Sequence, residues 1–200
     1  AANHQYLQSL AKDPSKVHLV YHGLDFTRFE HVDRVSRANV NGSSADNPVK
    51  IISVGRAVPK KGYDDLINAL AKLPKDLHWQ LTHIGGGSIL KSLLQQAKDL
   101  GIDKHIEWQG AQPQLTVLEA YRESDLFVLA SKIVADGDRD GMPNVLMEAQ
   151  SQSVCCLATD ISGIPELIDS GENGVLVKSN NVEQLTAALE ALLRDGEKRE

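Results

Sequence analysis

Residues 49–70 read VKIISVGRAVPKKGYDDLINAL and contain a strand, a loop and a helix in succession. The run over residues 49–55 is apolar on both faces and rich in β-branched side chains, which is typical of a strand buried between two layers. From Tyr63 the apolar side chains recur at i, i+3 and i+4, which predicts an amphipathic helix over residues 63–73. A buried strand followed closely by a helix is the repeating unit of a parallel sheet.

The same alternation continues along the chain. Further strand-like runs are predicted at residues 17–23, 77–85, 105–110, 126–131, 155–160 and 174–178. Helical periodicity is predicted at residues 88–100, 114–124, 144–153 and 182–194. With right-handed crossovers, this repetition predicts an α/β fold with a Rossmann-like, doubly wound parallel sheet. Such folds bind ligands at the carboxyl edge of the sheet, so the residues that follow each strand are the first candidates for a site.

The composition is that of an ordinary globular protein. Of 200 residues, 42% are hydrophobic and 24% are charged, which excludes a disordered chain and a disulfide-stapled miniprotein. The formal net charge is -6, so the chain lacks the basic excess that nucleic-acid binding requires. We therefore expect no nucleic-acid partner, and any anionic ligand must be held by local geometry.

The sequence also bears on location and redox state. No run approaches the roughly 18 consecutive apolar residues of a membrane span, and the opening residues AANHQYLQSL lack the basic and apolar regions of a signal peptide. Cys155 and Cys156 are sequence neighbours, which rules out a disulfide framework or a zinc site built from them. These features predict a cytoplasmic protein whose cysteines are reduced core residues.

The segment ADGDRDGMPNVLMEA, residues 135–149, joins a predicted strand to a predicted helix at the binding edge. Proline is favoured at the first helical position, so Pro143 marks the expected helix start. The backbone amides over Met142–Val145, Asn144 included, are then free to bind an anion, and Gly141 before them allows a ligand close to the backbone.

Two carboxylates bracket this helix start, Asp140 before it and Glu148 in its second turn. Carboxylates repel phosphate but accept hydrogen bonds from hydroxyl groups, and acidic residues bind ribose in dinucleotide folds. A ligand with phosphates in the middle and a sugar at each end fits this arrangement. The alternative is structural, with Asp140 stabilising the helix dipole and Glu148 exposed to solvent.

A second cluster follows the first quoted strand, where Gly55 and Arg56 end the strand and Lys60 and Lys61 lie in the loop. Arginine offers a bidentate fork and lysine a point charge, a common pair for a diphosphate. The structural alternative is that the lysines are solvated loop charges and that Arg56 pairs with an acid. In the predicted fold, however, this loop and Asp140 both lie at the carboxyl edge of the parallel sheet.

The acidic run also invites two metal-site interpretations. Asp136, Asp138, Asp140 and the following glycine spell the opening of an EF-hand loop, but position twelve is Met147 and Glu148 comes one residue too late. Asp136 and Asp138 also spell the D-x-D of metal-dependent glycosyltransferases, which have a different fold. Because the basic loop and the helix start already neutralise a diphosphate, we predict no metal.

Other enzyme classes fit less well. A dinucleotide fingerprint counted from Gly85 and Gly87 requires a third glycine where Leu90 stands. Ser131 follows a strand but lacks the G-x-S-x-G context of a nucleophile. The histidines in or beside strand runs lack ligand spacing and are predicted to be structural: His18, His78, His83 and His105.

Several motifs, in this order, give the chain a family resemblance. They are VYHGLDFTRF, VGRAVPKKGYDDLINAL, HIGGGSILKSLLQQAKDLGI, IEWQG, AYRESDLFVLAS, GMPNVLMEA, ATDISGIPELI and ENGVLVKSNNVEQLTAAL. Over nearly its whole length the chain resembles the C-terminal, donor-binding half of family-4 retaining glycosyltransferases of the GT-B fold. His22 stands where that family usually has Asn.

The resemblance implies roles for individual residues. The family's Glu-x7-Glu signature maps onto Asp140 and Glu148, which implies contact of Asp140 with the donor sugar and of Glu148 with the nucleotide ribose. Asp140 is one methylene shorter than the family's Glu, which bears on the choice of sugar or on activity. Arg56 and Lys61 match the diphosphate-binding pair, so Arg56, Lys61 and Asp140 are the catalytic candidates.

The resemblance also implies softer nucleotide contacts, which a purely structural turn explains equally well. The triple glycine from Gly85 to Gly87 matches a turn near the nucleotide. Gln109 and Gly110 match a loop near the base.

The function implied is retaining transfer of a sugar from a UDP-, GDP- or ADP-sugar to a glycan or glycolipid acceptor, in bacterial surface polysaccharide biosynthesis and without a cofactor. Residues 1–15 are then the end of a missing N-terminal domain and the interdomain linker, and residues 16–200 are the nucleotide-sugar-binding domain. The acceptor would bind the missing domain, which could associate peripherally with the inner face of the membrane. The fragment alone is expected to be inactive. The alternatives are a sugar-nucleotide epimerase of the same architecture and a catalytically degenerate binding module.

Overall fold

The computed structural model describes residues 2–25, 27–29, 32 and 35–200. Phe26, within the quoted VYHGLDFTRF motif, and Ala1, within the predicted 1–15 segment, lie outside the described residues. The sheet has six strands in the order β3-β2-β1-β4-β5-β6, and every neighbouring pair is parallel. The strands are β1 (Val49–Val54), β2 (Trp79–Ile84), β3 (Ile106–Gly110), β4 (Leu126–Leu129), β5 (Cys155–Thr159) and β6 (Val175–Val177).

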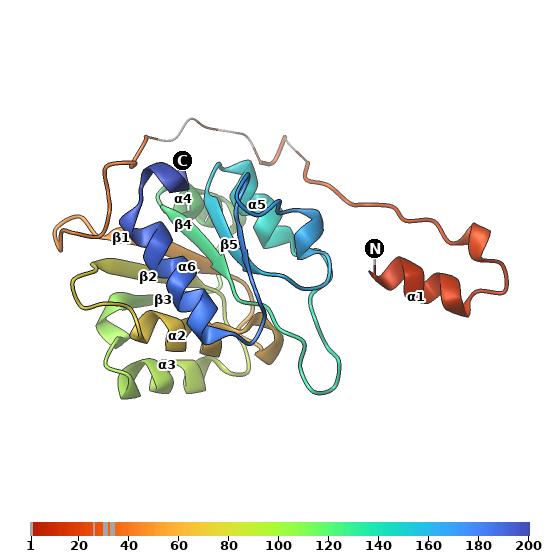
Figure 1. The fold of residues 1–200 in the computed structure, drawn as a ribbon, viewed down its shortest axis with the longest axis horizontal. Coiled ribbons are helices and arrows are strands. Elements are labelled where there is room, and N and C mark those ends of the chain that lie inside the picture. The colour runs from red at the N-terminus through yellow and green to blue at the C-terminus, as the bar shows by residue number, and fades with distance from the viewer. Residues whose placement is uncertain (1, 26, 30–31, 33–34) are drawn as a thin grey trace.

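Helices cover both faces of this sheet (Figure 1). The α-helices are α1 (Ala2–Leu10), α2 (Tyr63–Ala71), α3 (Leu90–Asp99), α4 (Gln114–Arg122), α5 (Asn144–Ser151) and α6 (Val182–Arg194). Short 3-10 helices are η1 (Pro14–Lys16), η2 (Pro59–Lys61), η3 (Asp103–His105), η4 (Ile164–Glu166) and η5 (Glu197–Arg199). One core cluster contains residues of α2, α3 and α6, and the other contains residues of α4 and α5. The predicted doubly wound α/β fold is confirmed.

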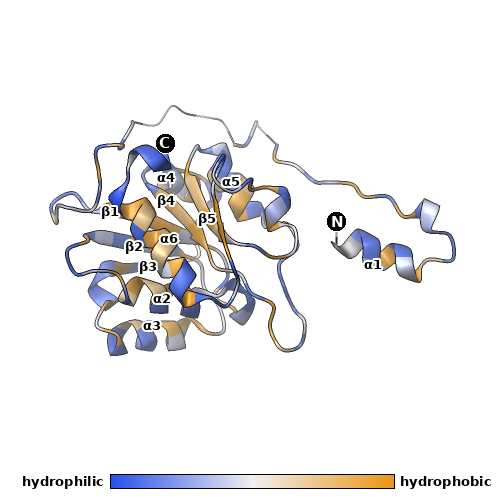
Figure 2. Ribbon diagram, in the orientation of Figure 1, coloured by the Kyte–Doolittle hydropathy of each residue, from blue (hydrophilic) through white to orange (hydrophobic). Residues whose placement is uncertain are grey.

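The strand interiors explain why the sequence forms this sheet. All four residues of β4 are buried, as are four of the five in β5. Figure 2 shows these strands as hydrophobic ribbons between helices with polar outer faces. The apolar surface on each face of a strand therefore packs against a helix layer, which strongly favours burial. Cys156 is buried and Cys155 is half-buried, and both are free thiols.

The strand predicted at residues 17–23 is wrong. These residues have no regular secondary structure, and their apolar side chains are solvent-exposed, with Val20 at 85% and Tyr21 at 55%. The run has the composition of a strand but pairs with no strand in the described part of the chain. It lies between η1 and the sheet domain, and α1 stands apart from the sheet in Figure 1.

The sheet order places two loops together. From β1 the order runs outward to β2 and β3, and from β4 it runs the other way to β5 and β6. This reversal between β1 and β4 is the switch point at which doubly wound folds bind ligands. The loop after β1 and the loop after β4 both leave the carboxyl edge there.

Backbone contacts hold these two loops against each other. The N–H of Lys132 donates to the carbonyl of Lys60 at 2.8 Å. Gly62 has a φ of 64°, and a Cβ at this position would lie 1.8 Å from the carbonyl oxygen of Ala130. Only a residue without a side chain permits this close approach.

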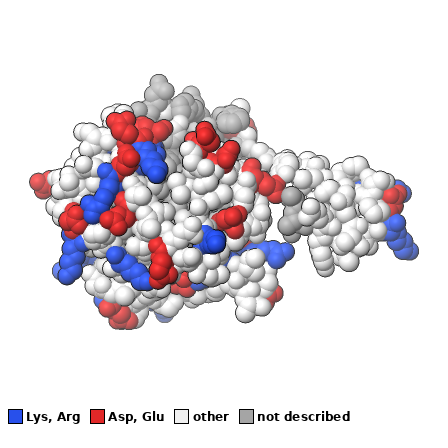
Figure 3. All heavy atoms as spheres, viewed as in Figure 1, with Lys and Arg blue, Asp and Glu red and all other residues white. Residues whose placement is uncertain are grey.

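Acidic and basic side chains are interspersed over the face in view in Figure 3, in line with the formal net charge of -6. No helix in the described ranges is both long enough and apolar enough to span a bilayer.

Candidate functional site

A buried ion pair joins the two loops at the switch point. Lys61 Nζ, from the loop after β1, lies 2.9 Å from Asp140 Oδ2, from the loop after β4, and these side chains are only 13% and 10% exposed. Ser131 Oγ donates to the same Oδ2 at 2.6 Å. Among the described residues, none hydrogen-bonds Asp140 Oδ1. Two of the three predicted catalytic residues are thus in contact, and both contacts fall on the same carboxylate oxygen.

Arg56 follows β1 in the same loop as Lys61, and its charge acts on Asp138 in the loop after β4. Its side chain is exposed and forms no hydrogen bond or ion pair with any residue that the structure describes. The neighbouring Lys60 behaves differently, because its Nζ pairs with Asp138 Oδ1 at 2.9 Å. The prediction that Lys60 is a solvated loop charge is therefore only partly right, since it anchors one loop to the other.

The amino end of α5 lies at the same edge. The helix begins at Asn144, so Pro143 is the residue before the first helical position rather than the first, and its ψ of 120° is extended. Proline has no N–H, so the predicted run of free amides is broken at Pro143. Met142, Asn144 and Val145 supply the N–H groups that find no backbone partner among the described residues.

His22 reaches the amino end of α5 from the N-terminal segment. Its Nε2 lies 2.6 Å from Asn144 Oδ1. The structure therefore brings the VYHGLDFTRF motif, at the start of the predicted 16–200 domain, into contact with the predicted anion site.

Glu148 lies in the second turn of α5, as predicted, and is half-buried. Burial raises the pKa of its carboxyl group, and a hydrogen bond from Tyr121 offsets this in part. Tyr121 also donates to the carbonyl of Val145 at 3.2 Å. The structural interpretation of Glu148 as a fully solvated side chain is therefore wrong.

The glycine turn after β2 packs against the loop after β1. The N–H of Ala57 donates to the carbonyl of Gly86 at 2.8 Å. A Cβ at Gly85 would lie 2.0 Å from the oxygen of Gly55, and one at Gly87 would lie 2.2 Å from the oxygen of Ala57. These two glycines have a structural reason to be glycine, and their contact with a nucleotide stays a prediction.

Gln109 and Gly110 end β3 beside this turn. The N–H of Gly85 donates to the carbonyl of Gly110 at 2.7 Å, and Gln109 Nε2 donates to Glu107 Oε1 at 3.1 Å. The candidates after β1, β2 and β3 therefore lie side by side along one edge.

Buried polar groups under the site were not identified as site residues by sequence reasoning. Tyr63 Oη is buried with no hydrogen-bond partner among the described residues. Burial raises the pKa of Tyr63, and the charge of Asp140 adds to this. His83 Nδ1 contacts Ser53 Oγ at 2.9 Å, and burial lowers the pKa of His83 to about 4. His83 is thus a neutral core residue, as its lack of ligand spacing predicts.

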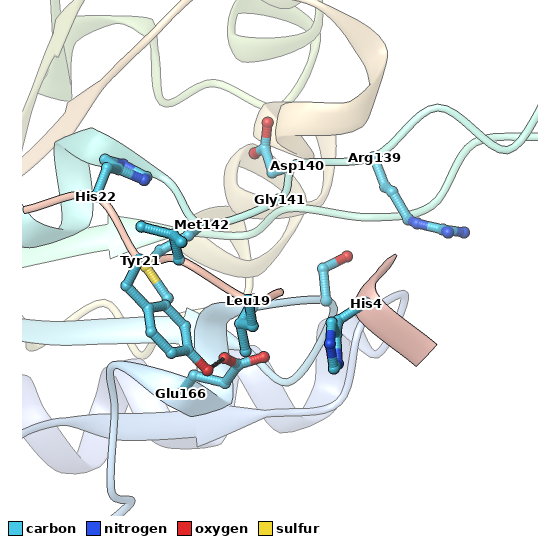
Figure 4. Close-up of a pocket in the computed structure, with 12 residues that line it drawn as sticks. His4, Leu19, Tyr21, His22, Arg139, Asp140, Gly141, Met142 and Glu166 are labelled. Carbon is cyan, nitrogen blue, oxygen red and sulfur yellow. Dashed lines mark hydrogen bonds between the residues drawn. The ribbon is translucent and has the colours of Figure 1, made fainter. Parts of the chain in front are cut away.

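A hollow of about 240 Å³ opens between the N-terminal segment and the loop after β4. Figure 4 shows the Asp140 carboxylate pointing away from this hollow, while Tyr21 hydrogen-bonds Glu166 across it. The hollow is lined by His4, Leu19, Val20, Tyr21, His22, Arg139, Asp140, Gly141, Met142, Ser162, Gly163 and Glu166. It therefore lies on the other side of the 139–142 segment from Lys61.

The acidic run does not gather around a common point. Asp138 pairs with Lys60, Asp140 pairs with Lys61, and Asp136 Oδ1 accepts the N–H of Asp138 at 2.9 Å. Among the described residues, no three His, Cys, Asp or Glu side chains are grouped to hold a metal ion.

These features define a Rossmann-like α/β domain with cationic side chains and a helix amino end at its switch point. Residues 37–200 match the family model described as glycosyl transferases group 1, and the chain belongs to this family. The predicted resemblance to a C-terminal GT-B domain is thereby confirmed at the level of the family.

Two relatives and one solved structure illustrate the similarity. The chain is 31% identical over 176 residues to the GDP-mannose-dependent alpha-(1-6)-phosphatidylinositol monomannoside mannosyltransferase of Mycolicibacterium smegmatis, covering 86% of this chain and 46% of the relative. It is 33% identical over 143 residues to the amylovoran biosynthesis glycosyltransferase AmsK of Erwinia amylovora, covering 71% of this chain and 35% of the relative. Anabaena Alr3699/HepE, solved with UDP and glucose, shares the fold with a TM-score of 0.74 at 21% identity, covering 98% of this chain and 53% of that one.

The chain thus spans less than half the length of these curated relatives. The roles assigned above to single residues stay predictions.

Proposed function

We propose that this chain is the donor-binding half of a retaining glycosyltransferase, which transfers a sugar from a nucleoside diphosphate sugar to a glycan or glycolipid in polysaccharide assembly. The observation that carries the proposal is the Lys61–Asp140 contact of 2.9 Å at the switch point, flanked by Arg56 and the amino end of α5. The names of the relatives support the reaction class, since one is GDP-mannose-dependent and another serves amylovoran biosynthesis.

In this proposal the diphosphate lies between Arg56 and the amino end of α5. Departure of the nucleoside diphosphate builds negative charge on its outer phosphate. The Arg56 fork and the free N–H groups at Met142, Asn144 and Val145 are positive groups already in place to meet that charge. The Lys61 ammonium, although paired with Asp140, keeps further N–H donors for the phosphate. Because these groups supply the neutralising charge, we propose that donor binding requires no divalent metal.

The two acids take the sugar ends of the donor. Asp140 Oδ1 accepts a hydroxyl of the transferred sugar, while Oδ2 stays with Lys61 and Ser131. Glu148 accepts the ribose hydroxyls. The Asp140 side chain is short, and Lys61 and Ser131 hold its carboxylate in place. It therefore hydrogen-bonds only a sugar hydroxyl that lies close to the sheet edge, or a more distant hydroxyl through a bridging water.

The proposal assigns the acceptor to a second domain and residues 1–15 to the connection with it. The 200-residue chain is then expected to bind the donor without sustained transfer. Binding is accordingly the appropriate readout for this chain.

Arg56→Ala is expected to weaken binding of the preferred nucleoside diphosphate roughly 10- to 100-fold, because charge-assisted hydrogen bonds contribute about 1.5–3 kcal/mol. Isothermal titration of the wild-type and variant chains with UDP, GDP and ADP measures this. Lys104→Ala is the matched control, since it removes one exposed cation in η3, at the opposite edge of the sheet. Equal affinity in the wild-type and Arg56→Ala chains, or equal losses in both variants, would contradict the role given to Arg56.

Glu148 gives nucleotide binding a pH dependence. The ionised carboxylate accepts the ribose hydroxyls, and burial raises its pKa. As the pH falls, this carboxylate therefore protonates earlier than an ordinary Glu, and affinity falls with it. Titrations between pH 7.5 and 4.5, about the range that spans such a shift, are expected to show a steeper loss in the wild type than in Glu148→Gln. Titration of the phosphate is common to both proteins, so parallel profiles would exclude the ribose contact.

A further inference from the structure

Ser131 occupies a fully buried position two residues after the end of β4, at the candidate site. Its residue exposure is 0%, and its hydroxyl donates to Asp140 Oδ2 at 2.6 Å. The sequence suggests no role for it, because Ser131 lacks the G-x-S-x-G context of a nucleophile. Its hydroxyl instead contacts the short Asp140 side chain and helps to hold the carboxylate in place.

The backbone of Ser131 is itself pinned from the neighbouring strands. Its carbonyl oxygen accepts the hydroxyl of Thr159, at the end of β5, at 2.6 Å and the hydroxyl of Ser179, after β6, at 3.3 Å. Thr159 is 3% exposed. The Ser131 hydroxyl therefore starts from a fixed point, and its hydrogen bond fixes the Asp140 carboxylate in turn.

Asp140 is held at one oxygen by two donors of different kinds. The Lys61 ammonium and the Ser131 hydroxyl both meet Oδ2, and no described residue hydrogen-bonds Oδ1. Lys61 ends η2 and has a long, rotatable stem, whereas Ser131 has a short side chain and a backbone carbonyl that Thr159 and Ser179 hold in place. Of the two, Ser131 is the contact that defines the orientation of the carboxylate plane.

We propose that Ser131 is a positioning residue that presents Asp140 Oδ1 to the transferred sugar and so sets the preference for nucleotide-sugar over free nucleotide. This inference rests on the proposed function. Ser131 touches neither the sugar nor the nucleotide. It orients the one group that binds the sugar, and holding that group in advance reduces the ordering cost of binding.

The test compares affinities for paired ligands in the same chain. Wild-type and Ser131→Ala proteins are titrated by calorimetry with three pairs of ligands: UDP and UDP-glucose, GDP and GDP-mannose, and ADP and ADP-glucose. Ser131→Ala is expected to bind the nucleotide-sugar of the preferred pair roughly 3- to 10-fold more weakly than the wild type, because the Asp140–sugar hydrogen bond is weakened and not abolished. The affinity for the sugar-free member is expected to stay unchanged.

Thr159→Val is the matched control. It removes one buried hydroxyl of the same network with little change in volume, but it leaves the Ser131 hydroxyl on Asp140 and the Ser179 hydroxyl on the Ser131 carbonyl. Both variants lose one buried hydrogen bond, so their melting temperatures are expected to fall by similar amounts. Only Ser131→Ala is expected to lose the preference for nucleotide-sugar.

Each outcome has a distinct meaning. Loss of the preference in both variants, or equal weakening of nucleotide and nucleotide-sugar in Ser131→Ala, would show a structural role and overturn the inference. An unchanged preference in a folded Ser131→Ala protein would do the same. If the wild type binds none of the six ligands, the proposed function itself fails, and the inference falls with it.

Discussion

Lys61→Met is expected to lower the free energy of unfolding by about 3 kcal/mol, because removing one partner of a buried ion pair leaves the other charge uncompensated. The change leaves the Asp140 carboxylate, 10% exposed, with the Ser131 hydroxyl as its one remaining partner among the described residues. For a chain of this size the melting temperature should fall by roughly 6 to 12 °C. Urea unfolding followed by circular dichroism measures the free energy.

Lys60→Met is the control for this prediction. Lys60 is the adjacent residue in the same loop, and its partner Asp138 is 57% exposed, so water solvates the Asp138 carboxylate when Lys60 is removed. We expect its loss to cost less than about 1 kcal/mol. The double variant Lys61→Met/Asp140→Asn should recover much of the stability lost in Lys61→Met. If Lys61→Met is no more destabilising than Lys60→Met, the ion pair does not join the loops as described.

Gly85→Ala is expected to destabilise the fold by about 3 kcal/mol, through a backbone clash and a strained conformation together. The new Cβ would lie 2.0 Å from the carbonyl oxygen of Gly55, and the φ of 143° at this position is one that side chains rarely adopt. The oxygen belongs to backbone, so it cannot rotate away as a side chain could. The turn after β2 would have to separate from the loop that carries Arg56.

Gly86→Ala is the matched control within the same triple glycine. A Cβ at Gly86 meets nothing within 4 Å. Its unfolding midpoint in urea should therefore stay near that of the wild type, while that of Gly85→Ala falls. Similar midpoints for the two variants would mean that the turn is not packed against the Arg56 loop.

The sequence predicts the sheet well because both faces of its central strands are covered. Runs such as IISV and LFVL have no polar face, which is typical of an element that is buried on all sides. Their short length then favours a buried strand over a buried helix. The alternation with helical segments then fixes the parallel arrangement. Residues 17–23 have a similar composition, but a strand forms only where a neighbouring strand can hydrogen-bond it. Among the described residues, no strand pairs with residues 17–23.

The sequence predicts which residues form the site, but it does not predict how their side chains contact one another. The rule that ligands bind at the carboxyl edge places Arg56, Lys61 and Asp140 together without any coordinates. That Lys61 and Asp140 neutralise each other depends on side-chain reach across two loops, which the sequence does not encode locally. Ser131 escapes notice for the same reason, because its partner lies in the following loop. The shift of one residue at Pro143 reflects how loosely proline alone marks a helix start.

The central claim is that the edge between β1 and β4 binds a nucleoside diphosphate sugar, and thermal unfolding of the chain tests it most directly. The protein is heated with UDP, GDP and ADP and with their sugars, with and without magnesium. A ligand at a hundred times its Kd adds about 2.7 kcal/mol, or roughly 5 to 10 °C for a chain of this size. We predict a shift that is selective for one base, independent of magnesium and absent in Arg56→Ala. No shift with any of these ligands, or an equal shift in Arg56→Ala, would contradict the account.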